Sequence, residues 1–196
     1  MPGFEEVSVY LRGIHALVMG RRDGLAWLDI SAAGVWRSFS AIVWSLPALA
    51  IGWASFRLSY LSGFPAGTSV GASFFVKLLI VDILSWIGPL VIIAILSRPL
   101  GFSDMIAPLI VASNWFSLPA LYLGAVPIAL NLIAPQMAGF ASFLMLVVLF
   151  GSIFALFRIV RSICGEQTLL AVALTTLFIL PAVIIAQFLQ HAFGLG

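Results

Sequence analysis

One stretch of the chain, residues 105–157, constrains the fold more than any other feature. It contains 53 consecutive residues without Asp, Glu, Lys or Arg. A single helix of that length would extend ~80 Å, whereas ~20 apolar residues already cross the ~30 Å hydrocarbon core of a bilayer. The stretch therefore predicts two membrane-spanning helices. The break between them is expected at residues 131–139, where Asn, Pro, Gln and Gly gather.

Three further uncharged stretches, residues 38–56, 83–97 and 167–190, complete the pattern. The middle one extends towards the N-terminus through residues 78–81, beyond Asp82. Strands of a membrane barrel would alternate apolar and polar residues over ~10 positions, so the long unbroken apolar runs favour helices. The sequence predicts an all-α, polytopic membrane helical bundle. Its transmembrane domain covers residues 39–196, with five spans at about 39–61, 73–97, 105–131, 138–160 and 168–190.

Composition and absent motifs exclude several classes of protein. The chain is 63% hydrophobic and 8% charged, against ~25% charged residues in ordinary soluble domains. This balance excludes a water-soluble enzyme and a disordered chain. A single cysteine excludes a disulfide framework, and the sequence has no P-loop and no HExxH motif. We therefore expect no catalytic residue, no cofactor, no metal and no nucleic-acid partner.

The nine basic residues predict how the chain is oriented in the membrane. Only Arg57 and Lys77 flank the first loop between spans, whereas seven arginines fall on the other side of the predicted bundle. Cytoplasmic loops carry an excess of Lys and Arg, so the N-terminus is expected in the cytoplasm and the C-terminus outside. The seven are Arg12, Arg21, Arg22, Arg37, Arg98, Arg158 and Arg161.

Residues 1–38 form a predicted cytoplasmic, amphipathic N-terminal region. Apolar residues recur there at the three- and four-residue steps of a helix, and a second apolar stretch follows, with Asp29 or Ser31 as a cap for a short helix. Two interpretations are open: a helix lying on the bilayer or docking a partner, and a lead-in helix packed on the bundle's own end. Because the basic residues are scattered, specific binding of acidic lipid is not indicated. The apolar positions of the first helix are Phe4, Val7, Leu11, Ile14 and Val18.

Asp82 is the one carboxylate well inside a predicted span. A charge at that depth costs ~2.5–3.5 kcal/mol, which makes the residue a candidate functional site. On a helix it shares a face with Ser85, Trp86 and Pro89. We expect Arg57, on the neighbouring first span, to be its partner. A structural ion pair, a protonated carboxyl bonded inside the bundle, and a proton or cation relay are the three interpretations.

Asn114 is the second polar candidate, and it lies beside Ser113 and Ser117 in the third span. An amide in hydrocarbon needs a partner, so we expect it to point into the bundle and bond to another helix. Neither Ser85 nor Ser117 has a histidine in a neighbouring span, which leaves a serine protease unsupported. The candidate intramembrane polar site therefore consists of Asp82, Arg57, Asn114, Ser85 and Ser117.

Six prolines fall within the predicted spans, and each is expected to kink its helix. Three of them lie in the third span. That span either breaks into two shorter pieces, as transporter helices do at binding sites, or bends only to shape its packing. The six are Pro47, Pro89, Pro108, Pro119, Pro127 and Pro181.

The pattern resembles the bacterial branch of the Yip family, the Ypt- and Rab-interacting membrane proteins. The resemblance covers most of the chain and rests on the N-terminal region, the five spans, Trp36-Arg37-Ser38-Phe39, and Arg98-Pro99-Leu100-Gly101 ahead of Pro108 and the stretch Asn114 to Pro119. The Asp-Leu-Tyr-Gly-Pro signature of eukaryotic members is absent, and Leu28-Asp29-Ile30-Ser31 is the nearest stretch. The resemblance implies an architecture but neither a trafficking role nor Rab partners. Eight arginines against one lysine fit a bacterial genome of high GC content, and we expect the protein in a bacterial inner membrane.

Two functions follow as hypotheses. The first is a non-enzymatic inner-membrane protein that organises the bilayer or binds a membrane-protein partner or a second copy of itself. It rests on the N-terminal helix and on the lack of a connected polar pathway. The alternative is a small transporter or channel that uses Asp82 and Asn114 in a polar pocket of the bundle.

Overall fold

The computed structural model describes residues 2–165 and 167–195, and all regular secondary structure within them is helical. Five helical segments are long and apolar enough to cross a membrane, which confirms the predicted all-α bundle of a multi-pass membrane protein. Their long helices are α3 (Ala41–Leu61), α4 (Ala72–Leu100), α5 (Ile106–Ile133), α6 (Ala138–Cys164) and α7 (Thr168–Ala192).

The helix boundaries follow local sequence signals. The longest uncharged stretch breaks between α5 and α6, where the short 3-10 helix η3 (Pro135–Met137) makes the turn. At the end of α4, Gly101 takes a φ of +76°, which only glycine adopts without strain, and its N–H bonds the carbonyl of Arg98. Proline and glycine therefore mark the ends of these helices at positions that hydrophobicity alone does not identify.

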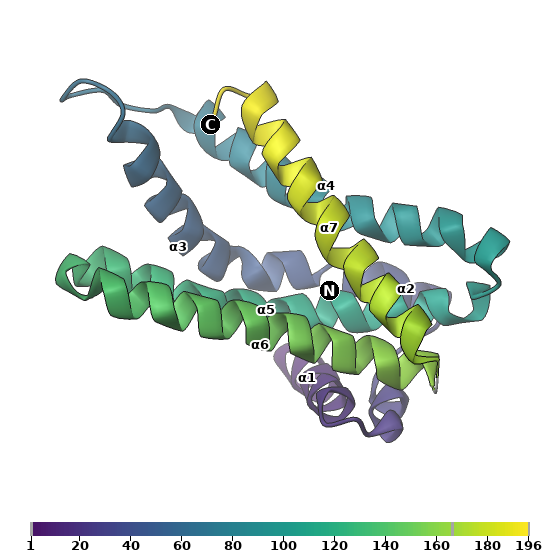
Figure 1. Cartoon of the computed structure of the whole chain (residues 1–196). Coiled ribbons are helices and arrows are strands. Elements are labelled where there is room, and N and C mark those ends of the chain that lie inside the picture. The colour runs from purple at the N-terminus through teal and green to yellow at the C-terminus, as the bar shows by residue number, and fades with distance from the viewer. Residues whose placement is uncertain (1, 166, 196) are drawn as a thin grey trace.

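The spans pack in two groups, α3 with α5 and α6, and α4 with α7, which are joined mainly by the contact between α6 and α7. Helix α5 packs along α3 and α6, and α4 packs along α7, which also contacts α6. Figure 1 shows α5 and α6 as an antiparallel pair, with α4 and α7 crossing each other above them. Only residues 62–71 join α3 to α4, yet α3 packs mainly on α5. Helices α3 and α4 therefore contact each other chiefly through long side chains near the loop that joins them.

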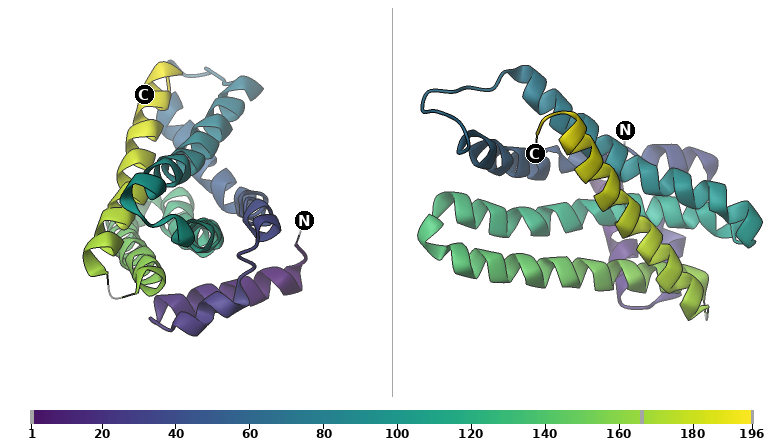
Figure 2. Two further views of the ribbon diagram at one scale, coloured as in Figure 1. Left: turned by 90° about the vertical axis from the view of Figure 1, so that its right-hand side faces the viewer. Right: turned by 45° about the horizontal axis from the view of Figure 1, so that its top comes forward.

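The N-terminal region folds against the bundle. It comprises α1 (Phe4–Val18), the 3-10 helix η1 (Arg22–Trp27) and α2 (Ala32–Ser38). The predicted amphipathic helix is present, and its apolar residues Ile14 and Leu17 are buried in a core with Trp115 of α5 and Ile159 of α6. Of the two interpretations, the structure contains the lead-in helix that packs on the bundle. Figure 2 shows α1 as a layer along one side of the long helices.

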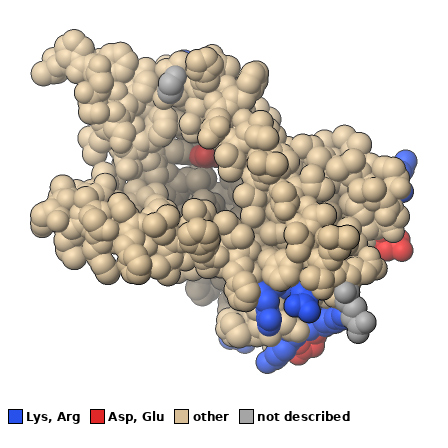
Figure 3. All heavy atoms as spheres, in the orientation of Figure 1, with Lys and Arg blue, Asp and Glu red and all other residues tan. Residues whose placement is uncertain are grey.

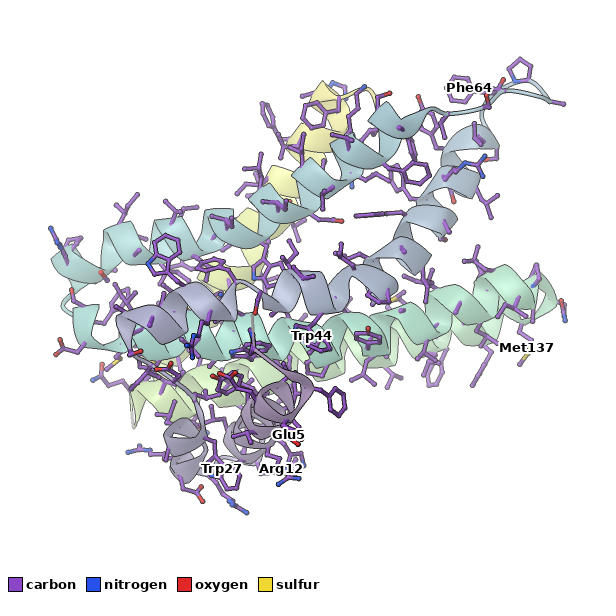
Figure 4. The ribbon with its side chains drawn as sticks, turned by 180° about the vertical axis from the view of Figure 1, so that it is seen from behind. Glu5, Arg12, Trp27, Trp44, Phe64 and Met137 are labelled. Atoms are coloured by element: carbon purple, nitrogen blue, oxygen red, sulfur yellow. The ribbon has the colours of Figure 1, made fainter. Side chains whose placement is uncertain are left out.

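A network of polar side chains joins α1 to α2. The Tyr10 hydroxyl donates to Glu6, and Glu6 lies 3.6 Å from the Arg37 guanidinium. Burial and the neighbouring Glu6 carboxylate raise the pKa of Tyr10 from its ordinary value of 10.0 to about 12, so the hydroxyl remains a donor further into alkaline pH. Of the two caps that the sequence offered, Asp29 and Ser31, it is Ser31 that caps α2 by accepting the N–H of Gly34. The opposite side of α1 and η1 faces away from the long helices, as the labelled Arg12 and Trp27 show (Figure 4).

The structure contradicts two predictions about the prolines of the third span, α5. Pro108 is the third residue of α5, where its missing N–H removes no intrahelical bond, so the kink predicted at this position is wrong. Helix α5 also runs without a break from residue 106 to 133 through Pro119 and Pro127, and the prediction of two shorter pieces is wrong. A break would expose further backbone groups to hydrocarbon, which is costly. Pro47, Pro89 and Pro181 lie inside α3, α4 and α7, as predicted.

Candidate functional site

A cavity of about 480 Å³ lies among the five spans. All five long helices contribute to its wall, and most of the wall is apolar. Its size falls within the ~300–1,000 Å³ that is usual for ligand pockets. Figure 3 shows a hollow in this part of the molecule, with acidic atoms visible inside an otherwise uncharged surface. The polar residues of the wall are Asp82, Ser85, Ser113, Ser117 and Ser152.

Among the described residues, Asp82 is the one acidic residue in the wall of this cavity. Its Oδ2 accepts a hydrogen bond from the indole Nε1 of Trp53 on α3, at 2.7 Å. Within the described residues its other oxygen has no hydrogen-bond donor, and no basic side chain lies within ion-pair distance. The carboxyl group is thus anchored on one side and available on the other.

The ion pair expected between Asp82 and Arg57 is not formed. Arg57 lies one turn beyond Trp53 on α3 and lines a separate surface hollow beside Leu58 and Phe75. Near the end of a span, a long arginine side chain reaches the headgroup layer and avoids desolvation. Trp53, already inside the span, supplies the donor in its place. The other base on this side, Lys77, donates to the carbonyl of Phe193 at 2.9 Å.

Ser85 and Ser117 lie in the same cavity wall as Asp82. The Ser117 hydroxyl donates to the carbonyl of Asn114 at 2.6 Å, which satisfies its proton within α5. The Ser85 hydroxyl is buried and has no hydrogen-bond partner in the described part of the chain. Trp86 and Pro89 line the cavity too, so the face predicted from helical spacing is the face that borders it.

Asn114 lies outside the cavity, in a sealed contact between three helices. Its side chain is 0% exposed. Its Nδ2 donates to Ser38 Oγ of α2 at 2.8 Å, and its Oδ1 accepts from Trp86 Nε1 of α4 at 2.9 Å. The interhelical bonds expected of this amide are present. The structure therefore brings Asp82, Ser85 and Ser117 together, and it places Arg57 and Asn114 elsewhere.

Sequence reasoning missed Trp53, Gly124 and the contribution of α6 to the cavity. A signal for Trp53 exists: a tryptophan in the middle of a span carries an N–H that needs an acceptor when buried, and Asp82 is the strongest acceptor in the spans. No comparable signal marks the α6 wall, where Met145, Leu149 and Ser152 look like lipid-facing residues in the sequence.

Comparison with models of known protein families, with curated proteins and with solved structures finds no match to this chain. Among the described residues, no group of three or more His, Cys, Asp or Glu side chains is placed to hold a metal ion.

Proposed function

We propose that this protein is a non-enzymatic membrane protein that binds, and moves within the bilayer, a lipophilic molecule carrying a cationic or hydrogen-bond-donating group. The observation that carries the proposal is the Asp82 carboxyl in the cavity wall, with Trp53 on one oxygen and, within the described residues, no cation paired with it. An ionised carboxylate only accepts hydrogen bonds. In an apolar surrounding it gains most from a ligand that brings a positive charge or a donor.

The rest of the wall suits the apolar body of such a ligand. Leu49, Phe116, Val148 and Phe178 come from four different helices and leave few polar atoms around Asp82. Ser85 lies in the wall on the same face of α4, and its hydroxyl has no hydrogen-bond partner among the described residues. Since every span contributes to the wall, a shift of one helix changes the shape of the cavity, which is the arrangement that a carrier requires.

The first test replaces the carboxyl group. A fluorescent lipophilic cation, rhodamine 6G, is titrated against the protein in uncharged detergent, and fluorescence anisotropy gives the Kd. We expect D82N to weaken binding about tenfold or more, because a bond to a charged group contributes ~1.5–3 kcal/mol. D104N is the matched control, because Asp104 is exposed in the short helix η2 (Ser103–Met105), away from the cavity. Equal binding by wild type and D82N would contradict the proposal.

The second test fills the cavity without touching Asp82. Gly124 lines the wall, and a Cβ placed there meets no atom within 4 Å, so G124F has room for its side chain inside the cavity. G151F adds the same group on α6 at an exposed position that is also free of neighbours. We expect G124F, but not G151F, to abolish rhodamine 6G binding and its uptake into liposomes. If uptake with every variant equals that of empty liposomes, the protein binds the cation but does not transport it.

A second candidate, a partner-binding role of Yip-like architecture in a bacterial inner membrane, is supported by the N-terminal region. Trp36 is 78% exposed on α2. Its neighbour Val35 lines one hollow with Arg98 in the last turn of α4, and α1 packs on α6, whose last turn carries Arg161. The excess of basic residues there supports an N-terminus in the cytoplasm and a C-terminus outside. Reporter fusions at both termini test the orientation. Crosslinking in native membranes, comparing wild type with W36S, tests the partner, and an unchanged crosslinking pattern would contradict this role.

A further inference from the structure

Three arginines from two distant parts of the sequence surround one hollow at the end of α6. Arg22 comes from η1, and Arg158 and Arg161 come from the last two turns of α6. The hollow has a volume of about 520 Å³ and, unlike the intramembrane cavity, a predominantly polar wall. Figure 3 shows basic atoms gathered at the lower edge of the molecule, in the part that α1 and the end of α6 occupy.

The turn after α1 fixes the first guanidinium. Gly20 has a φ of +80°, and the Arg158 Nε donates to the carbonyl of Val18 at 3.0 Å. A Cβ on Gly20 would lie 2.5 Å from Nη2 of Arg158, so the guanidinium packs directly against this glycine. The Ser162 hydroxyl lies 3.1 Å from the carbonyl of Leu17 and holds the same turn to α6.

The end of α6 positions the second guanidinium. A Cβ on Gly165 would lie 3.1 Å from Nη2 of Arg22, which places the η1 arginine against the glycine that follows α6. Arg161 lies between Arg158 and Gly165 in the sequence and lines the same hollow. The three side chains thus converge because η1 is docked on α6 through α1.

The charge of this cluster is not balanced by any carboxylate that the structure describes. The ion pairs within the described residues are Arg21 with Asp23 and Arg37 with Glu6, and neither involves the cluster. Guanidinium groups present planar pairs of N–H donors that match the oxygens of a phosphate. Three of them around a polar hollow form a site for a phosphate dianion better than for a single carboxylate.

We propose that Arg22, Arg158 and Arg161 form a binding site for a phosphate group at the membrane surface. The site is separate from the Asp82 cavity and goes beyond the function proposed for it. Since α6 ends at Cys164, the arginines lie at the level of the lipid headgroups. The phosphate therefore belongs either to an anionic lipid or to a soluble molecule, and the chemistry of recognition is the same.

The test uses purified protein in uncharged detergent and three probes: short-chain phosphatidic acid, the matching diacylglycerol without phosphate, and inorganic phosphate. Thermophoresis gives each Kd. We expect phosphatidic acid to bind and diacylglycerol not to bind. R161Q should weaken binding ~5-fold and R22Q with R161Q ~25-fold, from the usual contribution of one surface arginine. R98Q removes one exposed arginine at the end of α4 and should change nothing.

The three probes distinguish the possible sources of the phosphate, and their results can overturn the proposed site. Inorganic phosphate that binds with the same dependence on Arg22 and Arg161 identifies a soluble ligand, whereas binding of phosphatidic acid alone identifies a lipid headgroup. Phosphatidic acid bound as tightly by the double variant as by wild type would overturn the proposal. So would binding that appears only in E166Q, because Glu166, which lies outside the described residues, would then neutralise the arginines.

Discussion

Asn114 and Asp82 are both polar residues inside membrane spans, yet they differ in how fully the protein encloses and hydrogen-bonds them. Asn114 is fully enclosed, and both ends of its amide are bonded, to Ser38 and to Trp86. Asp82 has one indole donor and borders a cavity. Trp86 belongs to both regions, since its N–H bonds Asn114 while its ring lines the cavity.

The difference shows what makes a polar group structural or available for a ligand. The amide of Asn114 lies where α2, α4 and α5 meet, so three helices supply its partners and exclude everything else. Asp82 lies where α3 and α4 are held apart, so one long side chain from α3 reaches it. Hydrogen bonding that is complete inside the protein contributes to stability, whereas bonding that is incomplete leaves a site for another molecule.

The largest expected effect is that of N114L on stability. The substitution leaves the buried N–H of Trp86 without an acceptor, and it removes the donor to Ser38. Since each buried unpaired group costs ~1–3 kcal/mol, we expect the free energy of unfolding to fall by about 2 kcal/mol in reversible unfolding in mixed micelles. N131L, at the exposed end of the same helix, is the control. A loss equal to that of N131L would contradict the structural role of Asn114.

W53F should have the next largest effect. It removes the donor to Asp82 that the described residues provide. An interhelical bond in a membrane contributes ~0.6–1.7 kcal/mol, so the unfolding free energy should fall by about 1 kcal/mol. W36F makes the same change at a tryptophan that is 78% exposed and should have no effect. If W53F and W36F unfold alike, Trp53 does not anchor Asp82.

S85A should be close to neutral for stability, because its hydroxyl has no partner to lose in the described part of the chain. S38A is the contrasting variant, since it removes the acceptor for Asn114 and should cost ~1 kcal/mol. The same unfolding assay compares the two. Equal costs would mean that Ser85 is bonded in the membrane and that the cavity is less available than proposed.

R57Q should have the smallest effect, on both stability and rhodamine 6G binding, because Arg57 does not pair with Asp82. Variants are measured by the unfolding and anisotropy assays. A fall of about 1 kcal/mol or more in the unfolding free energy is typical of a partly buried charge pair and not of a surface pair. That result would indicate that Arg57 does form an ion pair with Asp82.

Much of the architecture was predictable because it depends on local composition. The uncharged runs predict five helices within a few residues of their ends, and the periodicity of residues 4–18 predicts α1. The face of α4 that carries Asp82, Ser85 and Trp86 followed from helical spacing. The partner of Asp82 did not, because the choice between Arg57 and Trp53 depends on how α3 leans away from α4.

The sequence by itself determined that the chain crosses a membrane with five helices, because the cost of placing charge or open backbone in hydrocarbon acts on each segment separately. Tertiary structure alone decided which polar groups are enclosed and which are available. It closed Asn114 between three helices, left Asp82 in a cavity, and brought Arg22 to Arg158 and Arg161 from the far end of the chain. These outcomes depend on the packing between helices, which hydrophobic spans of nearly uniform composition do not specify locally.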